Sequence, residues 1–406
     1  MYDIAAIGAW LEFAVRWLHV ITAIAWIGSS FYFIALDLGL HRDRNLASGA
    51  DGEEWQVHGG GFYHIQKYLI APDAMPEHLV WFKWEAYSTW LSGFFLLFLV
   101  YYLGADFYLI DPAVMDLAPW QAIAISLASL ALGWLAYDTI CKSKFGDDNT
   151  RLMIALYIIL VGLAYFYTHV FSGRAALLHL GAFTATIMSA NVFFIIMPNQ
   201  RIVIADLKAG RKPDAKYGKI AKQRSTHNNY LTLPVIFMML SNHYPLAFST
   251  QNTWIIASLV FLMGVTIRHF FNTMHMRKGT PYWAWLVTAI IFLTIAWLST
   301  APMFGADEDP EAGIVTRFAE AEGFEHVTDI VMGRCSMCHN AEPFYDGILW
   351  APKGVRLDTP ANITRNARMI YLQAGLSHAM PPANVSFIEP AERQAIIDWY
   401  AAATKG

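Results

Sequence analysis

The chain has 406 residues, of which 56% are apolar and only 15% are charged, whereas an ordinary soluble domain is about 25% charged. This deficit excludes an ordinary water-soluble domain and indicates a membrane protein. The net charge of −4 is unevenly distributed, because residues 1–300 carry +2 and the chain from Ala301 onward carries −6. We therefore expect a hydrophobic body followed by an acidic soluble domain, with a lipid bilayer and no nucleic acid as partners.

The first apolar stretch is long enough to span a membrane, and no Lys or Arg precedes Arg16. We expect an uncleaved first helix rather than a signal peptide. The chain has only three cysteines, Cys141, Cys335 and Cys338. They provide no disulfide framework, so their pattern indicates cofactor chemistry.

A membrane span needs about 20 apolar residues, because every backbone polar group must be satisfied inside the helix. Seven segments have or approach that length: about Phe13 to Leu36, Trp81 to Leu103, Trp120 to Ile140, Leu152 to Phe171, Ala175 to Met197, Thr253 to Met274 and Tyr282 to Thr300. An eighth, Tyr230 to Phe248, is weaker because Pro234 and Pro245 interrupt it. We predict an all-α fold with an eight-span transmembrane bundle over residues 1–302.

The charges of the connecting loops favour the eighth span. The connections near Arg42, near Lys142 and from Arg201 to Arg224 are basic, whereas those at Asp106 to Asp116 and Asn242 to Asn252 contain no Lys or Arg. Basic and non-basic loops alternate only if all eight segments cross, and this topology places both termini outside.

One inner connection is long for a loop without structure of its own. It contains His41, His58, His64, His78 and the run Gly59-Gly60-Gly61. We expect it to form interfacial helices or a cover over the inner face of the bundle.

The run Cys335-Ser336-Met337-Cys338-His339 has the spacing of covalent c-type haem attachment, in which both thiols bond the haem and the histidine ligates iron. A chance match or a metal site is the alternative interpretation. Residues 303–312 are acidic and turn-rich and predict a linker. Apolar periodicity predicts one helix leading into the motif and a closing helix at Glu389 to Lys405 that packs against it. We therefore predict a second domain over residues 313–406.

These parts together resemble a class I cytochrome c, a small helical fold whose haem iron has two axial protein ligands. The resemblance implies that His339 is the proximal ligand and that Met380, 41 residues later, is the distal one. His378 is the competing distal ligand. A proline carbonyl is also implied as the partner of the proximal imidazole, and Pro343 and Pro352 are both open as its source. Haem attachment of this kind implies a periplasmic domain on a bacterial inner membrane, in agreement with the predicted topology.

Ionisable side chains inside a membrane are costly, so each is a candidate functional residue. Four histidines are predicted in the outer half of the bundle: His19, His169, His179 and His243. Their positions on different spans suit bis-histidine ligation of a b-type haem, with His19 and His169 as first choices. The alternative interpretation, in which each histidine bonds a neighbouring backbone or hydroxyl group, stays open.

A second polar set is predicted near the inner face. It comprises His227, Asn228, Asn229, Arg268, His269 and Asn272. Arg268 and Asn272 are four residues apart and share one helix face. An arginine with amides suits a planar anion that carries alternating donors and acceptors. Interfacial snorkelling and loop capping are the alternative interpretation.

Two longer runs carry a family resemblance, and a shorter opening pattern fits it. They are Ser225-Thr226-His227-Asn228-Asn229-Tyr230-Leu231-Thr232-Leu233-Pro234, Met239-Leu240-Ser241-Asn242-His243-Tyr244-Pro245, and Arg16-Trp17-Leu18-His19-Val20 with Trp26-Ile27-Gly28. With the motif at residues 335–339, they make the chain resemble, over essentially its whole length, the bacterial membrane-bound urate hydroxylases. Members of that family have eight spans and a fused C-terminal cytochrome c.

The resemblance implies an enzyme that oxidises urate to 5-hydroxyisourate, with water as the oxygen source. It implies electron transfer to the c-type haem and then to a respiratory-chain acceptor, either a terminal oxidase or a soluble cytochrome. In the inner set, Arg268 with Asn228 or Asn229 would orient urate, and His227 or His269 would take the proton.

Two alternatives stay open at this point. If the pocket instead lies in the outer half, near Arg16, His19 and His243, no second haem is needed. In the other alternative, the chain is a non-catalytic, membrane-anchored electron carrier between a dehydrogenase or quinol oxidiser and a terminal oxidase.

Overall fold

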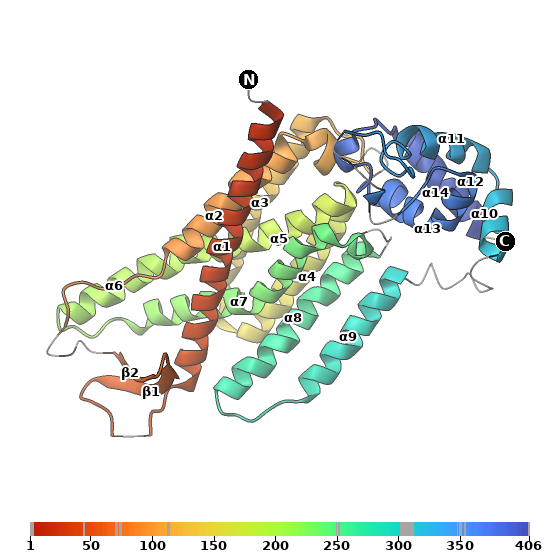
Figure 1. Ribbon diagram of the computed structural model, residues 1–406. Helices are drawn as coiled ribbons and strands as arrows, with labels where there is room; N and C mark the ends of the chain where they lie inside the picture. The colour runs from red at the N-terminus through yellow and green to blue at the C-terminus, as the bar shows by residue number, and fades with distance from the viewer. Residues whose placement is uncertain are drawn as a thin grey trace.

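The computed structural model of the chain is mostly helical, as predicted (Figure 1). It describes residues 4–43, 45–69, 72, 75–111, 114–248, 250, 252–300, 312–346, 348, 351–352 and 355–404. The predicted linker at residues 303–312 lies outside these ranges, apart from its last residue.

The membrane body is a bundle of long helices. They are α1 (Ile4–Gly39), α2 (Trp84–Leu97), α3 (Pro119–Lys142), α4 (Asn149–Thr168), α5 (Gly173–Ala190), α6 (Met197–Lys208), α7 (Ala215–Leu240), α8 (Thr253–His275) and α9 (Trp283–Thr300). The π-helical turn η1 (Phe98–Tyr102) extends α2, η2 (Ala105–Leu109) follows it, and η4 (Asn191–Ile196) joins α5 to α6. Helix α5 packs against α2, α3, α4 and α7 and is the most buried helix of the bundle.

Six helical segments in the described ranges are long and apolar enough to cross a membrane: Trp10–Gly39, Pro119–Lys142, Asn149–Thr168, Gly173–Lys208, Thr253–His275 and Trp283–Thr300. The other two predicted spans are not in this set, although both are largely helical. The first coincides with α2 and η1, and the second with the apolar end of α7, which stops at Leu240. The eight-span topology therefore stays a prediction.

The long connection after α1 forms an antiparallel hairpin, β1 (Ala50–His58) and β2 (Gly61–Tyr68), instead of interfacial helices. Gly59 and Gly60 form its turn with φ of 60° and 80°, left-handed values that glycine adopts without strain. The prediction of an all-α fold is wrong at this point, because the glycine run ends a strand instead of a helix.

Ion pairs attach the hairpin to the end of the bundle where α1 ends and α7 begins. Asp37 of α1 forms an ion pair with Lys67 of β2, and its second oxygen lies 3.2 Å from Nζ of Lys222 on α7. Within the hairpin, Nε2 of His64 lies 2.8 Å from a carboxylate oxygen of Glu53. The carboxylate of Asp37 thus joins α1, the hairpin and α7.

Residues 312–404 form a separate helical unit. Its helices are α10 (Ala312–Glu320), α11 (Phe324–Arg334), α12 (Pro360–Arg365), α13 (Ala367–Ile370) and α14 (Pro390–Thr404), with the π-helical turn η9 (Tyr371–Leu376) and the short turn η10 (Pro382–Asn384). The predicted packing of the closing helix is present, because Trp399 is buried and its Nε1–H donates to the carbonyl of Phe318 at 3.0 Å. The single helix predicted before the cysteines is instead two, separated at Gly323.

The C-terminal unit lies at the same end of the bundle as the start of α1, and the hairpin lies at the opposite end (Figure 1). This is the arrangement that an even number of crossings produces. It separates the cysteine pair from the start of α7 and the end of α8 (Figure 1).

Close packing of α7 against α8 depends on Gly264. A Cβ atom at this position would lie 2.5 Å from Cδ of Pro234, whereas a Cβ atom at Gly162 would meet nothing within 4 Å. We expect Gly264→Ala to lower the free energy of unfolding by about 1–3 kcal/mol through overpacking. Thermal unfolding of the detergent-solubilised protein measures this loss. Gly162→Ala is the control, and equal melting temperatures for the two variants would contradict the prediction.

Candidate functional site

Arg268 is the centre of a buried polar cluster between α7 and α8. Its Nε–H donates to Oδ1 of Asn229 at 3.2 Å, and an Nη2–H donates to Oδ1 of Asn272 at 3.0 Å. Asn272 in turn donates to the same Asn229 oxygen at 2.9 Å. The guanidinium lies 4.0 Å from the ring centre of Phe31, so α1 closes one side of the cluster.

Two features of this cluster indicate an anion site. Arg268 is 4% exposed, yet in the described part of the chain no carboxylate forms an ion pair with it. Asn229 is fully buried, and its Nδ2 has no hydrogen-bond partner among the described residues. A buried cation and an unused amide donor are both costly unless a ligand supplies acceptors.

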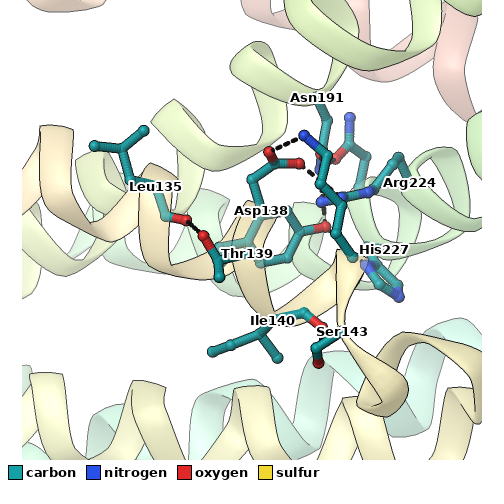
Figure 2. A network of polar contacts seen from close by, with 11 residues as sticks. Leu135, Asp138, Thr139, Ile140, Ser143, Asn191, Arg224 and His227 are labelled. Atoms are coloured by element: carbon teal, nitrogen blue, oxygen red, sulfur yellow. Dashed lines mark hydrogen bonds and ion pairs between the residues drawn. The ribbon is translucent and has the colours of Figure 1, made fainter.

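A second buried cluster connects α3, η4 and α7 (Figure 2). Arg224 donates to Oδ1 of Asp138 at 2.8 Å and to Oδ1 of Asn191 at 3.4 Å. The Asn191 amide donates to the hydroxyl oxygen of Tyr137 at 3.0 Å, and that hydroxyl lies 2.7 Å from Nδ1 of His227. A continuous set of hydrogen bonds thus connects the ion pair of Arg224 and Asp138 to His227.

The second cluster orients His227. Because Arg224 donates to the Asn191 carbonyl, the Asn191 amide faces the hydroxyl oxygen of Tyr137 and donates to it. The Tyr137 hydroxyl lies 2.7 Å from Nδ1 of His227, and either of these two groups can be the donor. His227 is therefore held at the end of a continuous set of hydrogen bonds that begins at Arg224.

A cavity of about 90 Å³ lies beside this cluster. Its walls come from α3, α4, α5, α7 and α8 and are mainly apolar, with Tyr137, Tyr157, Thr184 and His227 as the polar contributors. The hydroxyl of Thr184 donates to the backbone of its own helix, and that of Tyr157 donates to the carbonyl of Ser258. At the other polar end of the cavity, Tyr137 and His227 are bonded to each other.

The predicted inner set is divided between these clusters. Arg268, Asn229 and Asn272 meet as predicted, whereas His227 and Asn228 belong to the second cluster, where Asn228 accepts from Asn191 at 3.0 Å. His269 joins neither, because its ring faces Trp283 of α9 at 5.6 Å.

Sequence reasoning missed the residues that hold the second cluster. Arg224 was placed in a basic loop, but it is 1% exposed within α7. Asp138 is an acidic residue within a predicted apolar span, and such a residue indicates a buried partner or a functional site. Tyr137, Asn191 and Phe31 carry no distinguishing pattern in the sequence.

The outer histidines have separate surroundings. Nδ1 of His19 lies 3.0 Å from the carbonyl of Thr89, and its ring lies against Gly93 of α2. His179 is fully buried, with both ring nitrogens bonded, one to the carbonyl of Ala175 and the other to Ser126.

The other two outer histidines are more accessible. His169 stacks on Tyr165 at the end of α4, with ring centres 4.0 Å apart, and His243 is exposed. Within the described ranges, no ring contact joins any two of the four outer histidines.

In the C-terminal unit the motif residues fit haem attachment. Cys335 and Cys338 are free thiols, and Nδ1 of His339 lies 2.8 Å from the carbonyl of Val355, which leaves Nε2 for iron. The accepting carbonyl is therefore that of Val355 and not of Pro343 or Pro352. Burial raises the pKa of Cys335 to about 12, which disfavours the thiolate that a metal centre requires. Among the described residues, no group of three or more His, Cys, Asp or Glu side chains converges as a metal centre.

Arg224 and Lys142 both contact Asp138, but they differ in burial. Their side chains are 2% and 64% exposed. We expect Arg224→Met to lower the free energy of unfolding by about 3 kcal/mol, the low end for a broken buried pair, because Lys142 still faces Asp138. Lys142→Met, the matched control, should change it by less than about 0.5 kcal/mol. Thermal unfolding measures both, and similar losses would refute the assignment of a buried pair.

A family model described as urate oxidase N-terminal matches residues 5–299 of the chain. This match covers the whole membrane body and ends before the C-terminal unit. No curated protein and no solved structure shows a significant match.

Proposed function

The chain belongs to the urate oxidase N-terminal family, and on this premise we propose that it is a membrane-bound urate-oxidising enzyme. It converts urate to 5-hydroxyisourate with water as the oxygen source. The electrons pass to a c-type haem held by its own C-terminal unit and then to a respiratory-chain acceptor. The enzyme is located in a bacterial inner membrane, with the C-terminal unit on the periplasmic side.

The observation that carries this proposal is the uncompensated guanidinium of Arg268. Urate is a planar anion whose edges alternate donors and acceptors, and it would supply the missing negative charge. The free amide donor of Asn229 would meet one of its carbonyl oxygens or ring nitrogens. Phe31, which supports the guanidinium from α1, keeps this edge of the site dry.

The chemistry balances without molecular oxygen. Urate and one water give 5-hydroxyisourate, two protons and two electrons. Loss of electrons leaves C5 electrophilic, and the water oxygen forms the new bond there. His227 and His269 are the residues that we first expected to take the proton, but neither bonds to the Arg268 cluster. His227 is bonded to Tyr137, and the ring centre of His269 lies 5.6 Å from that of Trp283. A water or the substrate itself is therefore proposed as the proton acceptor.

The C-terminal unit would receive these electrons. Cys335 and Cys338 would attach the haem, His339 would be one axial ligand and Met380 the other. Bound there, the haem supplies a one-electron acceptor that must be reduced twice for each urate.

The distance between the Arg268 site and the C-terminal unit favours an additional electron carrier in the membrane body. Arg268 lies near the inner end of α8, about 22 Å along the helix from Thr253 at 1.5 Å per residue. Urate there does not touch the C-terminal unit, so a b-type haem between them is proposed. His19 suits ligation because its Nδ1 is held by a backbone carbonyl, with His169 as its proposed partner. His179 is less suited, because both of its nitrogens are already bonded.

The urate site is tested by Arg268→Met in purified full-length protein. Mixed with urate without oxygen, wild-type protein should bleach urate absorbance while its haem becomes reduced. The variant should be about a hundredfold slower, the usual effect of removing one preorganised charge. Arg201→Met, on the exposed face of α6, is the control. Wild-type haem that stays oxidised in urate would refute the proposed function.

The haem content is tested by a pyridine haemochrome spectrum, which counts b-type and c-type haems separately. We expect one of each per chain, and a spectrum with haem c alone would remove the b-type haem from the proposal. Met380→Ala should lower the reduction potential of the c-type haem, because the soft thioether favours Fe(II). An unchanged potential would exclude Met380 as a ligand.

A further inference from the structure

The membrane body presents one buried carboxylate, Asp111, to the C-terminal unit. Asp111 follows η2, and its side chain is 8% exposed. The segment before it is fastened to the start of α5, because the backbone N–H of Ser172 donates to the carbonyl of Leu109 at 3.0 Å and its hydroxyl to that of Tyr108 at 2.8 Å. Asp111 is therefore carried by a fixed part of the bundle.

The C-terminal unit meets this carboxylate with the loop that contains Met380. Nε2 of His378 lies 3.2 Å from an Asp111 carboxylate oxygen. Arg393, which is buried, donates to the carbonyls of Met380 and Ala374. The guanidinium of Arg393 also interacts electrostatically with the negative charge of Asp111.

The loop of residues 378–387, which we call the Met380 loop, has an unusual backbone conformation. His378, Ala383, Asn384 and Phe387 all have positive φ, between 49° and 56°. Such conformations in non-glycine residues persist only where surrounding contacts impose them, and they concentrate at functional sites. The Oδ1 atom of Asn384 accepts from Arg393 at 3.3 Å, so the same arginine supports both ends of the loop.

The overall charges of the two parts do not explain this contact. The C-terminal part of the chain is acidic, and the outer loop of the body carries Asp106, Asp111 and Asp116 without any Lys or Arg. The attraction is therefore local, where Asp111 faces His378 at 3.2 Å and the charge of Arg393 lies near it.

We propose that Asp111 is the positioning residue that fixes the Met380 loop against the membrane body, so that electrons enter the C-terminal unit on its Met380 side. This inference rests on the proposed function for the identity of the electrons. The docking itself rests on the contact between Asp111 and His378 and on the hydrogen bonds that Arg393 donates within the C-terminal unit.

Asp111→Asn tests the proposal in full-length protein in lipid nanodiscs, with Asp116→Asn as matched control. Both variants remove one charge from the same outer loop, but Asp116 is exposed and no ion pair involves it in the described residues. We expect Asp111→Asn to slow the reduction of haem by urate by about tenfold or more, because the variant loses the carboxylate that faces His378 and its charge near Arg393. The rate at which dithionite reduces the haem of this variant, and the KM of the variant for urate, should be unchanged.

Hydrogen–deuterium exchange of residues 371–387 provides a readout that does not depend on activity. Asp111→Asn should increase exchange there, Asp116→Asn should leave it unchanged, and Asp111→Glu should restore most of the protection and of the rate. Wild-type exchange or a wild-type rate of reduction by urate in Asp111→Asn would overturn the proposal. If urate does not reduce the wild-type haem at all, the proposed function fails, and the exchange comparison alone decides whether Asp111 docks the loop.

Discussion

The structure depends on the requirement that buried polar groups in a membrane find partners inside the protein. Helix α7 carries Arg224, His227, Asn228 and Asn229 within two turns, and all four are buried. No single neighbour could satisfy them. Helix α3 supplies Asp138 and Tyr137, η4 supplies Asn191, and α8 supplies Arg268 and Asn272, so the packing of three elements around α7 follows from its polar side chains.

The two clusters on α7 differ in how completely they are satisfied. In the Arg224 cluster a carboxylate compensates the guanidinium, and each bond fixes the next group up to His227. In the Arg268 cluster the guanidinium contacts amide oxygens and aromatic rings, and no carboxylate of the described residues pairs with it. The first cluster has the character of a rigid support, and the second has the character of a site that is complete only with an anionic ligand.

Much of this arrangement could be predicted from the sequence. The apolar segments, the shared helix face of Arg268 and Asn272, and the apolar faces of the helices in the C-terminal unit follow from helical periodicity, which is a local property. The meeting of Arg268 with Asn229 was expected from the resemblance and from the predicted depth of both residues. Where long-range packing decides, the sequence was insufficient. Arg224 has the same appearance in a basic run as the exposed lysines near it, and only the position of Asp138 on another helix shows that it is buried. We predicted one site for His227 and Arg268 because both lie near helix ends. Successive side chains on a helix, however, point about 100° apart. His227 and Asn228 therefore face the second cluster, whereas Asn229 faces Arg268.

Helix α1 differs from the other walls of the Arg268 site, because most of its length is accessible in the monomer. It supplies Phe31 beneath the guanidinium, and its inner end is attached through Asp37 to Lys67 and Lys222, whose side chains are 43% and 65% exposed. Exposed ion pairs are screened by salt, whereas the hydrogen bonds between Arg268 and the buried asparagine side chains are not. The wall over the anion site is therefore the one whose ionic attachment weakens as ionic strength rises, whereas the hydrogen bonds of Arg268 to Asn229 and Asn272 do not.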